Sequence, residues 1–210
     1  MRLALLWLAV PACSAHAFEP KFEQIFNTKG EPAATHFKAT FVANGAEHQL
    51  EVWREANRIR RLTDGSAEVF AVRKTGSDGY RLSVLDLKKK IHTDIDRDNL
   101  YRMGNFTDWF DLGHGLRHPK GPYHLSAATA PTGAATPVAP CSWIDLEQQG
   151  RVTHVCWSAK SRLPLLMQAD DGRTIWRLSS VDHKPLAAAT FVIDDAGFVR
   201  NDANRDMAQD

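Results

Sequence analysis

Cysteine is scarce in this chain, and the short motifs that mark several common enzyme classes are missing. The sequence has 3 cysteines among its 210 residues. It contains no Gly-x-Ser-x-Gly motif, no phosphate-binding loop and no dinucleotide-binding glycine motif, which argues against the enzymes that use them. Two of the cysteines are predicted below to form a disulfide, so we expect no thiol nucleophile either. We therefore expect a protein that is not an enzyme and that carries no cofactor.

Long apolar runs and an excess of either charge are missing too. A membrane-spanning helix needs roughly 20 consecutive apolar residues, and no stretch of this chain reaches that length. The chain has 26 Lys plus Arg against 25 Asp plus Glu, and removal of Arg2 with the leader described next leaves 25 of each. A protein without net charge has no electrostatic basis for binding nucleic acid or an anionic membrane. We expect that this protein has no nucleic-acid partner and that it is not an integral membrane protein.

The first 17 residues, MRLALLWLAVPACSAHA, have the layout of a secretory signal peptide. One arginine precedes an apolar run, and the small-residue pattern Ala-His-Ala predicts cleavage before Phe18. We expect an exported, periplasmic protein with one domain over residues 18–200 and a polar tail at 201–210. A second interpretation makes Cys13 a lipid-modified first residue, because Val-Pro-Ala-Cys loosely resembles a lipoprotein processing site. That leader would be unusually short, so we favour the plain exported form.

Cys141 and Cys156 are the two cysteines of the exported chain, at the ends of CSWIDLEQQGRVTHVCW. An even number of cysteines in an oxidising compartment predicts a disulfide. A hairpin loop of residues 147–150 would place the two directly opposite each other, where Cβ atoms lie about 4.5–5.5 Å apart. A loop of this size contributes roughly 3 kcal/mol in the chain-entropy model. Since no Cys-x-x-Cys motif indicates redox activity, we expect a structural crosslink.

The rest of the mature chain reads largely as short strands. Runs such as HQLEVWRE, AEVFAVRK and YRLSVLDL alternate in polarity and are separated by Asn-Gly and Asp-Gly pairs, which is typical of an antiparallel meander. About eleven or twelve strands emerge, more than one strongly twisted sheet usually holds without curling. We therefore predict a mainly β protein with short helices, built as one curled antiparallel sheet.

Two segments show helical spacing instead of alternation. Residues 20–28 predict a short amphipathic helix. Residues 98–116, DNLYRMGNFTDWFDLGHGL, predict two further helical turns that carry large apolar side chains, the second capped by Thr107. The Ala/Pro/Thr-rich stretch at 126–140 is expected to be a mobile loop within the same domain.

Several stretches of the sequence resemble the periplasmic lipoprotein-carrier superfamily (LolA/LolB-like, with related lipoprotein-sorting and envelope-stress proteins). The family's strand–turn–strand unit with a central arginine resembles EVWREANRIRRLTDG, and its next strand pair resembles YRLSVLDLKKKIHTDI. The family's ending is similar to VCWSAKSRLPLLMQADDGRTIWRLSSVD followed by ATFVIDDAGF. The similarity spans most of residues 36–198, whereas the cysteine pair and the Ala/Pro-rich loop depart from the carrier itself. It implies an unclosed half-barrel, in which the sheet curls around an apolar cavity that holds a lipid or a lipidated protein and the helices form a lid.

The resemblance also implies which residues would bind that ligand. The apolar candidates are Phe41, Trp53, Leu82, Trp109, Phe110, Trp143 and Trp176. The family's central strand arginine is carried over to Arg60, with Arg58 nearly as eligible. Burial of an acyl chain there would gain about 0.8 kcal/mol per methylene. We expect a non-catalytic carrier of an acyl or lipoprotein ligand, although aromatic residues on strands are also ordinary core residues.

Two other functions stay open. The same scaffold would also serve as an interaction or sensor module that docks onto another envelope protein. In addition, the stretch GHGLRHPKGPYH carries His114, His118 and His124, and three histidines in one loop could converge on zinc or copper. Nearby glycines and Pro119 argue against a helical histidine pair. The simpler interpretation of these histidines is that they are scattered over the surface.

Overall fold

The computed structural model describes residues 20–76, 79–102 and 108–207. The predicted signal peptide, with Cys13, lies outside these residues. The strands are β1 (Ala34–Ala43), β2 (Ala46–Glu55), β3 (Arg58–Thr63), β4 (Ala67–Arg73), β5 (Tyr80–Asp86), β6 (Ile91–Asp96), β7 (Tyr123–Ala128), β8 (Ser142–Gln148), β9 (Arg151–Ser158), β10 (Leu163–Ala169), β11 (Thr174–Asp182) and β12 (Val199–Asp202). The helices are α1 (Phe22–Ile25), α2 (Arg97–Arg102), α3 (Trp109–His114), α4 (Ala203–Met207) and the 3-10 helix η1 (Ala188–Phe191).

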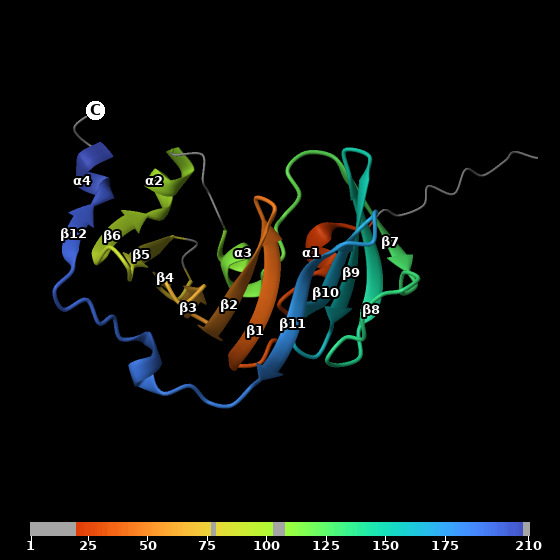
Figure 1. The fold of residues 1–210 in the computed structure, drawn as a ribbon, viewed down its shortest axis with the longest axis horizontal. Coiled ribbons are helices and arrows are strands. Elements are labelled where there is room, and N and C mark those ends of the chain that lie inside the picture. The colour runs from red at the N-terminus through yellow and green to blue at the C-terminus, as the bar shows by residue number, and fades with distance from the viewer. Residues whose placement is uncertain (1–19, 77–78, 103–107, 208–210) are drawn as a thin grey trace, which may run out of the picture.

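The strands of the described chain belong to one 12-stranded sheet, in the order β12-β6-β5-β4-β3-β2-β1-β11-β10-β9-β8-β7 (Figure 1). The pairing is antiparallel throughout, except that β12 runs parallel to β6. β12 and β7 form two separate edges, so the sheet is not closed. The prediction of a mainly β protein with one unclosed sheet and short helices is confirmed. Among the described residues, no helix has the length and apolar character needed to cross a membrane.

Tight turns with left-handed residues join neighbouring strands. Asn44 (φ 51°) and Gly45 (φ 76°) connect β1 to β2, and Gln149 (φ 53°) and Gly150 (φ 71°) connect β8 to β9. Two consecutive residues with positive φ are typical of the type I′ turn, whose twist matches that of paired strands. The sequence therefore sets these two registers locally.

The disulfide between Cys141 and Cys156 is present, with the two Cα atoms 5.4 Å apart. The predicted register of its hairpin is wrong, because Trp143, and not Cys141, lies opposite Cys156. The cause is the turn, which contains only two residues, so that Gln148 pairs with Arg151. Cys141 precedes β8 and reaches Cys156 diagonally, which ties the preceding Ala/Pro-rich loop to β9.

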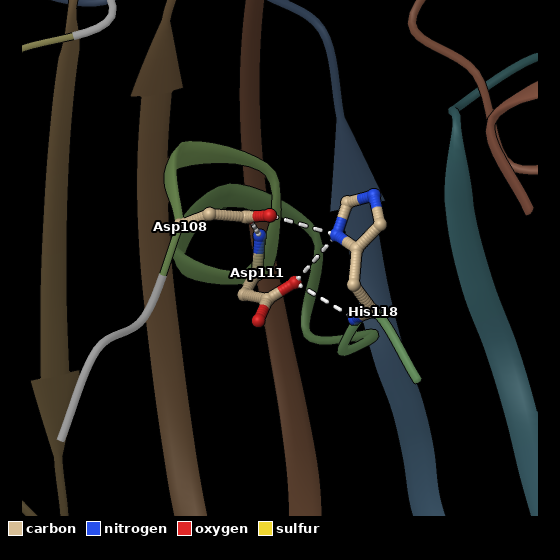
Figure 2. Close-up of side chains that lie close together, drawn as sticks. All are labelled: Asp108, Asp111 and His118. Carbon is tan, nitrogen blue, oxygen red and sulfur yellow. Dashed lines mark hydrogen bonds and ion pairs between the residues drawn. The ribbon is translucent and has the colours of Figure 1, made fainter. Parts of the chain in front are cut away.

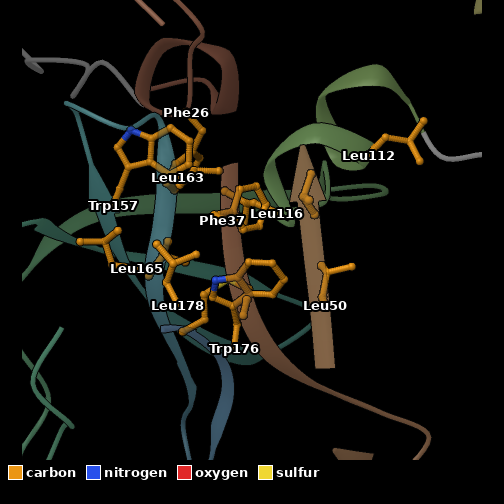
Figure 3. Packing of buried hydrophobic residues seen from close by; sticks show 14 of the residues in the cluster. Phe26, Phe37, Leu50, Leu112, Leu116, Trp157, Leu163, Leu165, Trp176 and Leu178 are labelled. Carbon is orange, nitrogen blue, oxygen red and sulfur yellow. The ribbon is translucent and has the colours of Figure 1, made fainter. Parts of the chain in front are cut away.

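Helices α1 and α3 cover one face of the sheet, called here the inner face, and the main core lies beneath them (Figure 3). Trp176 of β11 lies at its centre, only 3% exposed, and its Nε1 donates a hydrogen bond to the carbonyl oxygen of Pro164 at 2.8 Å. Gly115 follows α3 with φ +70°, and a Cβ atom there would lie 2.2 Å from the Trp176 ring. Only glycine allows α3 to end this close to the core.

The helical insert was predicted in the right place, but its cap was assigned to the wrong residue. Thr107 lies outside the described residues, and the N-cap of α3 is Asp108, whose side chain accepts a hydrogen bond from the backbone N–H of Asp111. Aspartate is a strong N-cap residue for the same reason as threonine, since its oxygen satisfies a free helix N–H. Asp108 therefore caps α3 and also lines the pocket beside this helix.

Residues 183–198, called here the strap, run along the opposite, outer face of the sheet (Figure 1). Arg60 Nη1 donates to the carbonyl oxygen of Thr190 at 3.1 Å, and His92 Nδ1 lies 2.7 Å from Asp195 Oδ2. The strap leads into β12 and α4, which pack on β6. The expected polar tail at 201–210 therefore begins inside a strand, and the folded domain continues past residue 200.

Candidate functional site

A pocket of about 470 Å³ opens on the inner face between α3, the segment after α1 and strands β2, β4 and β5. This volume lies within the usual range for small-molecule sites, roughly 300–1,000 Å³. Its apolar lining is mainly aromatic, with Phe26, Tyr80, Trp109 and Phe110 beside Ala56. Its polar lining carries charges of both signs, so it differs from the closed apolar core beside it.

Trp109 is the centre of the aromatic wall. The Arg73 guanidinium lies 4.4 Å from the centre of the Trp109 ring, and the Tyr80 ring lies 5.8 Å from it on a tilted plane. Arg73 is held by two hydrogen bonds from its Nε and Nη2 to the carbonyl oxygen of Ala56, at 3.1 and 3.0 Å. A cation over an indole ring is attracted by the negative face of the ring. The wall therefore combines an apolar surface with a fixed positive charge.

A buried charged network forms the floor of the pocket. Arg54 of β2 pairs with Glu31 through Nη2, and its Nη1 donates to the carbonyl oxygen of Gly113 in α3 at 2.8 Å. His114 of α3 donates from Nδ1 to the Phe110 carbonyl oxygen at 2.8 Å, and its Nε2 lies 3.1 Å from Glu31 Oε1. The network joins the sheet, α3 and the segment after α1. Its charge-assisted hydrogen bonds fix the position of α3 on the sheet.

Opposing effects act on the protonation of this network. Burial raises the pKa of Glu31, but the hydrogen bond from His114 and the charge of Arg54 outweigh it and lower that pKa. Burial lowers the pKa of His114, whereas its bond to Glu31 works in the opposite direction. Because both ring nitrogens of His114 face oxygen acceptors, the contacts require a proton on both nitrogens or on Glu31. The bond between His114 and Glu31 therefore opposes the effect of burial on the pKa of each group.

Two aspartates, Asp108 and Asp111, lie beside His118 at the rim of the pocket (Figure 2). His118 Nδ1 lies 2.8 Å from Asp108 Oδ2 and 3.2 Å from Asp111 Oδ1. Burial and the neighbouring Asp108 carboxylate raise the pKa of Asp111 to about 6. Burial, with Asp108 again contributing, raises the pKa of Tyr80 to about 12. The rim therefore brings two carboxylates and one imidazole into contact with one another.

The eight predicted ligand-binding residues do not line one cavity. Trp109 and Phe110 line the pocket. Leu82, Phe41 and Trp176 lie on the inner face, within or against the packed core. The prediction is wrong for Trp53, Arg60 and Trp143, because these three side chains point to the outer face.

Their position follows from the strand register. Trp53 lies opposite Arg60 and stacks on His36 at 5.1 Å, while the adjacent Arg54 points inward to α3. Trp143 lies opposite Cys156, on the side that faces the Ala/Pro-rich loop. Successive side chains of a strand point to opposite faces, so Trp53, Arg60 and Trp143 cannot contact a ligand on the inner face.

The three predicted metal-binding histidines are also held by different partners. His114 is buried against Glu31 and Phe110, whereas His124 is exposed on β7. Only His118 lies among potential metal ligands, and these are two aspartates and not the other histidines.

Sequence reasoning missed most of the polar residues of the pocket. Arg54 follows Leu50 and Val52 at alternate positions of β2, so its inward direction was readable from the alternation. Arg73 and Tyr80, which pair across β4 and β5, continue the same inner row. The meeting of Glu31, Arg54 and His114 left no local signal, because the three residues come from distant parts of the chain.

No protein-family model matches the chain, and no curated protein sequence matches it. Among solved structures, it is similar to PNGF-II in a P21 crystal form, where 84% of this chain aligns with 32% of that chain at 8% identity and a TM-score of 0.41. The C2 form of PNGF-II aligns over the same shares at 9% identity and a TM-score of 0.28. This chain spans about a third of the length of the chain it matches. A similarity of this degree carries no argument about function.

Proposed function

We propose that this protein is a non-catalytic carrier that holds the apolar part of a lipid or of a lipidated protein in the pocket beside α3. The observation that carries the proposal is the aromatic wall of Phe26, Trp109 and Phe110 in a pocket of about 470 Å³. A ligand that removes apolar side chains of an open pocket from water lowers the free energy of the system, which favours binding.

The apolar part of the ligand is short in this proposal. Most of the inner face is filled by packed side chains, with Trp157 in contact with Phe26 at 5.2 Å and Trp176 fully enclosed. In the described part of the chain, the end of the inner face near Trp109 leaves room for a ligand. The pocket therefore suits one end of an acyl chain, and not a lipid with several buried chains.

The polar end of the ligand would lie near the arginines of the pocket. Arg73 and Arg97 both line it, and a guanidinium group binds phosphate or carboxylate oxygens through paired hydrogen bonds. An anionic head group next to a short apolar chain satisfies both parts of the lining. The predicted signal peptide and the disulfide support a periplasmic location for this carrier, since disulfides persist in oxidising compartments.

The test is native mass spectrometry of the tag-free mature protein with a short-chain lysophosphatidylglycerol, or a peptide that carries one short acyl chain, as the probe. We expect one bound molecule on the wild type. Trp109→Ala should weaken binding by about tenfold or more, because a buried aromatic contact is worth roughly 1.5–3 kcal/mol. Trp143→Ala, which removes a tryptophan from the outer face, is the matched control and should bind like the wild type.

Two outcomes would contradict the proposal. One is the absence of any bound probe on the wild type at concentrations where other lipid-binding proteins are saturated. The other is equal binding by the wild type and Trp109→Ala, which would place the lipid elsewhere on the molecule.

A further inference from the structure

Three potential metal ligands converge at the start and end of α3 (Figure 2). Asp108 is the N-cap of the helix, Asp111 lies in its first turn, and His118 follows the helix in the segment that leads to β7. One ligand atom of each residue lies within 4.8 Å of the other two. The cluster therefore joins two turns of the chain that are separated by the whole length of α3.

The distances within the cluster are close to those between neighbouring ligands of one metal ion. His118 Nδ1 lies 2.8 Å from Asp108 Oδ2 and 3.2 Å from Asp111 Oδ1. Nitrogen and oxygen ligands at about 2.0–2.2 Å from a zinc ion are roughly 3.0–3.5 Å apart. Binding of an ion between the three atoms would need only small side-chain shifts.

The two carboxylates share one side-chain donor, although Asp108 Oδ1 also accepts from the Asp111 backbone N–H and Asp111 Oδ1 from the His118 backbone N–H. One imidazole nitrogen carries at most one proton, and it cannot donate a good hydrogen bond to both Asp108 and Asp111. Asp111 is half-buried and close to Asp108, and two carboxylates in such surroundings repel each other. A cation with more than one positive charge would neutralise this pair.

The other side of the His118 ring provides an independent indication. Its Nε2 faces Glu23 Oε1 of α1 at 3.7 Å, and the ring packs against Phe22 at 4.4 Å and Phe110 at 5.2 Å. A metal-binding histidine usually has a carboxylate beside its second nitrogen, which orients the ring and strengthens the ligand. Glu23 lies on that side of the ring, beyond hydrogen-bond distance, and the two aromatic rings hold the imidazole in place.

We propose that Asp108, Asp111 and His118 bind one divalent transition-metal ion. A mixed set of one imidazole and two carboxylates suits zinc and its first-row neighbours better than calcium or magnesium, which prefer oxygen ligands alone. Asp108 and His118 also line the pocket, so the remaining coordination positions open toward it and would be filled by water. The site does not depend on the carrier function, because none of its ligands belongs to the aromatic wall.

Zn²⁺ binding to the tag-free, chelator-treated protein tests the proposal, by isothermal titration calorimetry and by the shift in melting temperature. We expect one ion per chain. His118→Gln and Asp108→Asn should each lower the affinity by about tenfold or more. Asparagine is also a good N-cap residue, so the second variant should keep α3 folded, and circular dichroism would verify this.

Matched substitutions outside the cluster separate this site from general surface binding. His124→Gln removes a predicted but unclustered histidine, and Asp98→Asn removes a carboxylate that is 91% exposed. Both should bind Zn²⁺ like the wild type, and Co²⁺ should give visible absorption bands that disappear in His118→Gln. The proposal is overturned if the wild type binds no Zn²⁺. It is equally overturned if Asp108→Asn binds as tightly as the wild type, or if His124→Gln weakens binding as much as His118→Gln does.

Discussion

The two halves of the sheet bury their side chains differently. In the disulfide half, strands β7–β11, β10 is buried at six consecutive positions from Leu163 to Gln168. Helix α1 packs over one face of this half, and the Ala/Pro-rich loop packs on the other. In the pocket half, strands β1–β6, the inner face carries Arg54 and Arg61, and both donate to carbonyl oxygens of α3.

This difference explains where the pocket lies. Apolar side chains can close around one another without leaving space, as they do around Trp176. A buried arginine needs hydrogen-bond acceptors in fixed directions, which keeps α3 at a set distance from the sheet. Burial lowers the pKa of Arg61 to about 10, and the nearby Arg117 adds to this effect. We infer that the disulfide half provides stability and that the pocket half provides the binding surface.

The comparison is tested most strongly by removing one tryptophan from each half. Trp176→Ala should lower the free energy of unfolding by about 3–5 kcal/mol, because it leaves a cavity in a closed core. Trp109→Ala should lower it by only about 1 kcal/mol, since Trp109 lines an open pocket. Urea denaturation of the two variants measures both values. Equal losses would show that the two halves are packed alike.

Removal of the disulfide should give the next largest effect. The double variant Cys141→Ser with Cys156→Ser should lower the free energy of unfolding by about 3 kcal/mol. Hydrogen exchange should speed up in β8 and β9 while β3–β5 stay protected, because the crosslink lies wholly within the disulfide half. Reductant added to the double variant is the control and should change nothing. Uniform loss of protection across the sheet would contradict the division into halves.

The pH dependence of stability should come from the pocket half. Between the ordinary value of 3.8 and the raised pKa of about 6, Asp111 binds a proton in the folded state that it lacks in the unfolded chain. Stability from this group is therefore present below pH 4 and is lost as the pH rises to about 6, by on the order of 2 kcal/mol. In metal-free protein, Asp111→Asn should remove this loss, and Asp98→Asn should keep it. A pH profile of the Asp111→Asn variant identical to that of the wild type would refute this assignment.

The smallest expected effect concerns the cation over Trp109. Arg73→Gln should lower the free energy of unfolding by about 0.5–1 kcal/mol. Arg81→Gln is the matched control, because Arg81 is 69% exposed and pairs with Asp96, which is 49% exposed. Thermal unfolding of both variants under one condition would measure the difference. If both substitutions lowered the free energy of unfolding equally, the contact between Arg73 and Trp109 would make no specific contribution to stability.

Local patterns in the sequence predicted the parts of the fold that depend on neighbouring residues. The Asn44–Gly45 turn, the alternation of the strands and the pairing of Cys141 with Cys156 all follow from short stretches. The register of the cysteine hairpin did not, because Gln149 accepts a positive φ that the sequence favours only weakly. A two-residue turn then shifted the strands relative to the predicted loop.

The candidate site was less predictable. Alternation shows which residues share a face, but not which face is covered by α3, so Trp53 and Trp143 were assigned to the wrong side. The network of Glu31, Arg54 and His114 depends on contacts between distant segments, which no local pattern reports. Trp109 and Phe110 were singled out because a cluster of large apolar residues in a helical insert can be recognised from the sequence without knowing where the insert packs.

The most direct test of the carrier function is contact quenching of tryptophan fluorescence by a brominated acyl probe. Bromine quenches an indole ring only on contact, so the account predicts that the emission of Trp109 alone falls as the probe binds. The quenching should disappear in Trp109→Phe and remain in Trp143→Phe. Undiminished quenching in Trp109→Phe would contradict the account, because the acyl chain would then lie against a different part of the molecule.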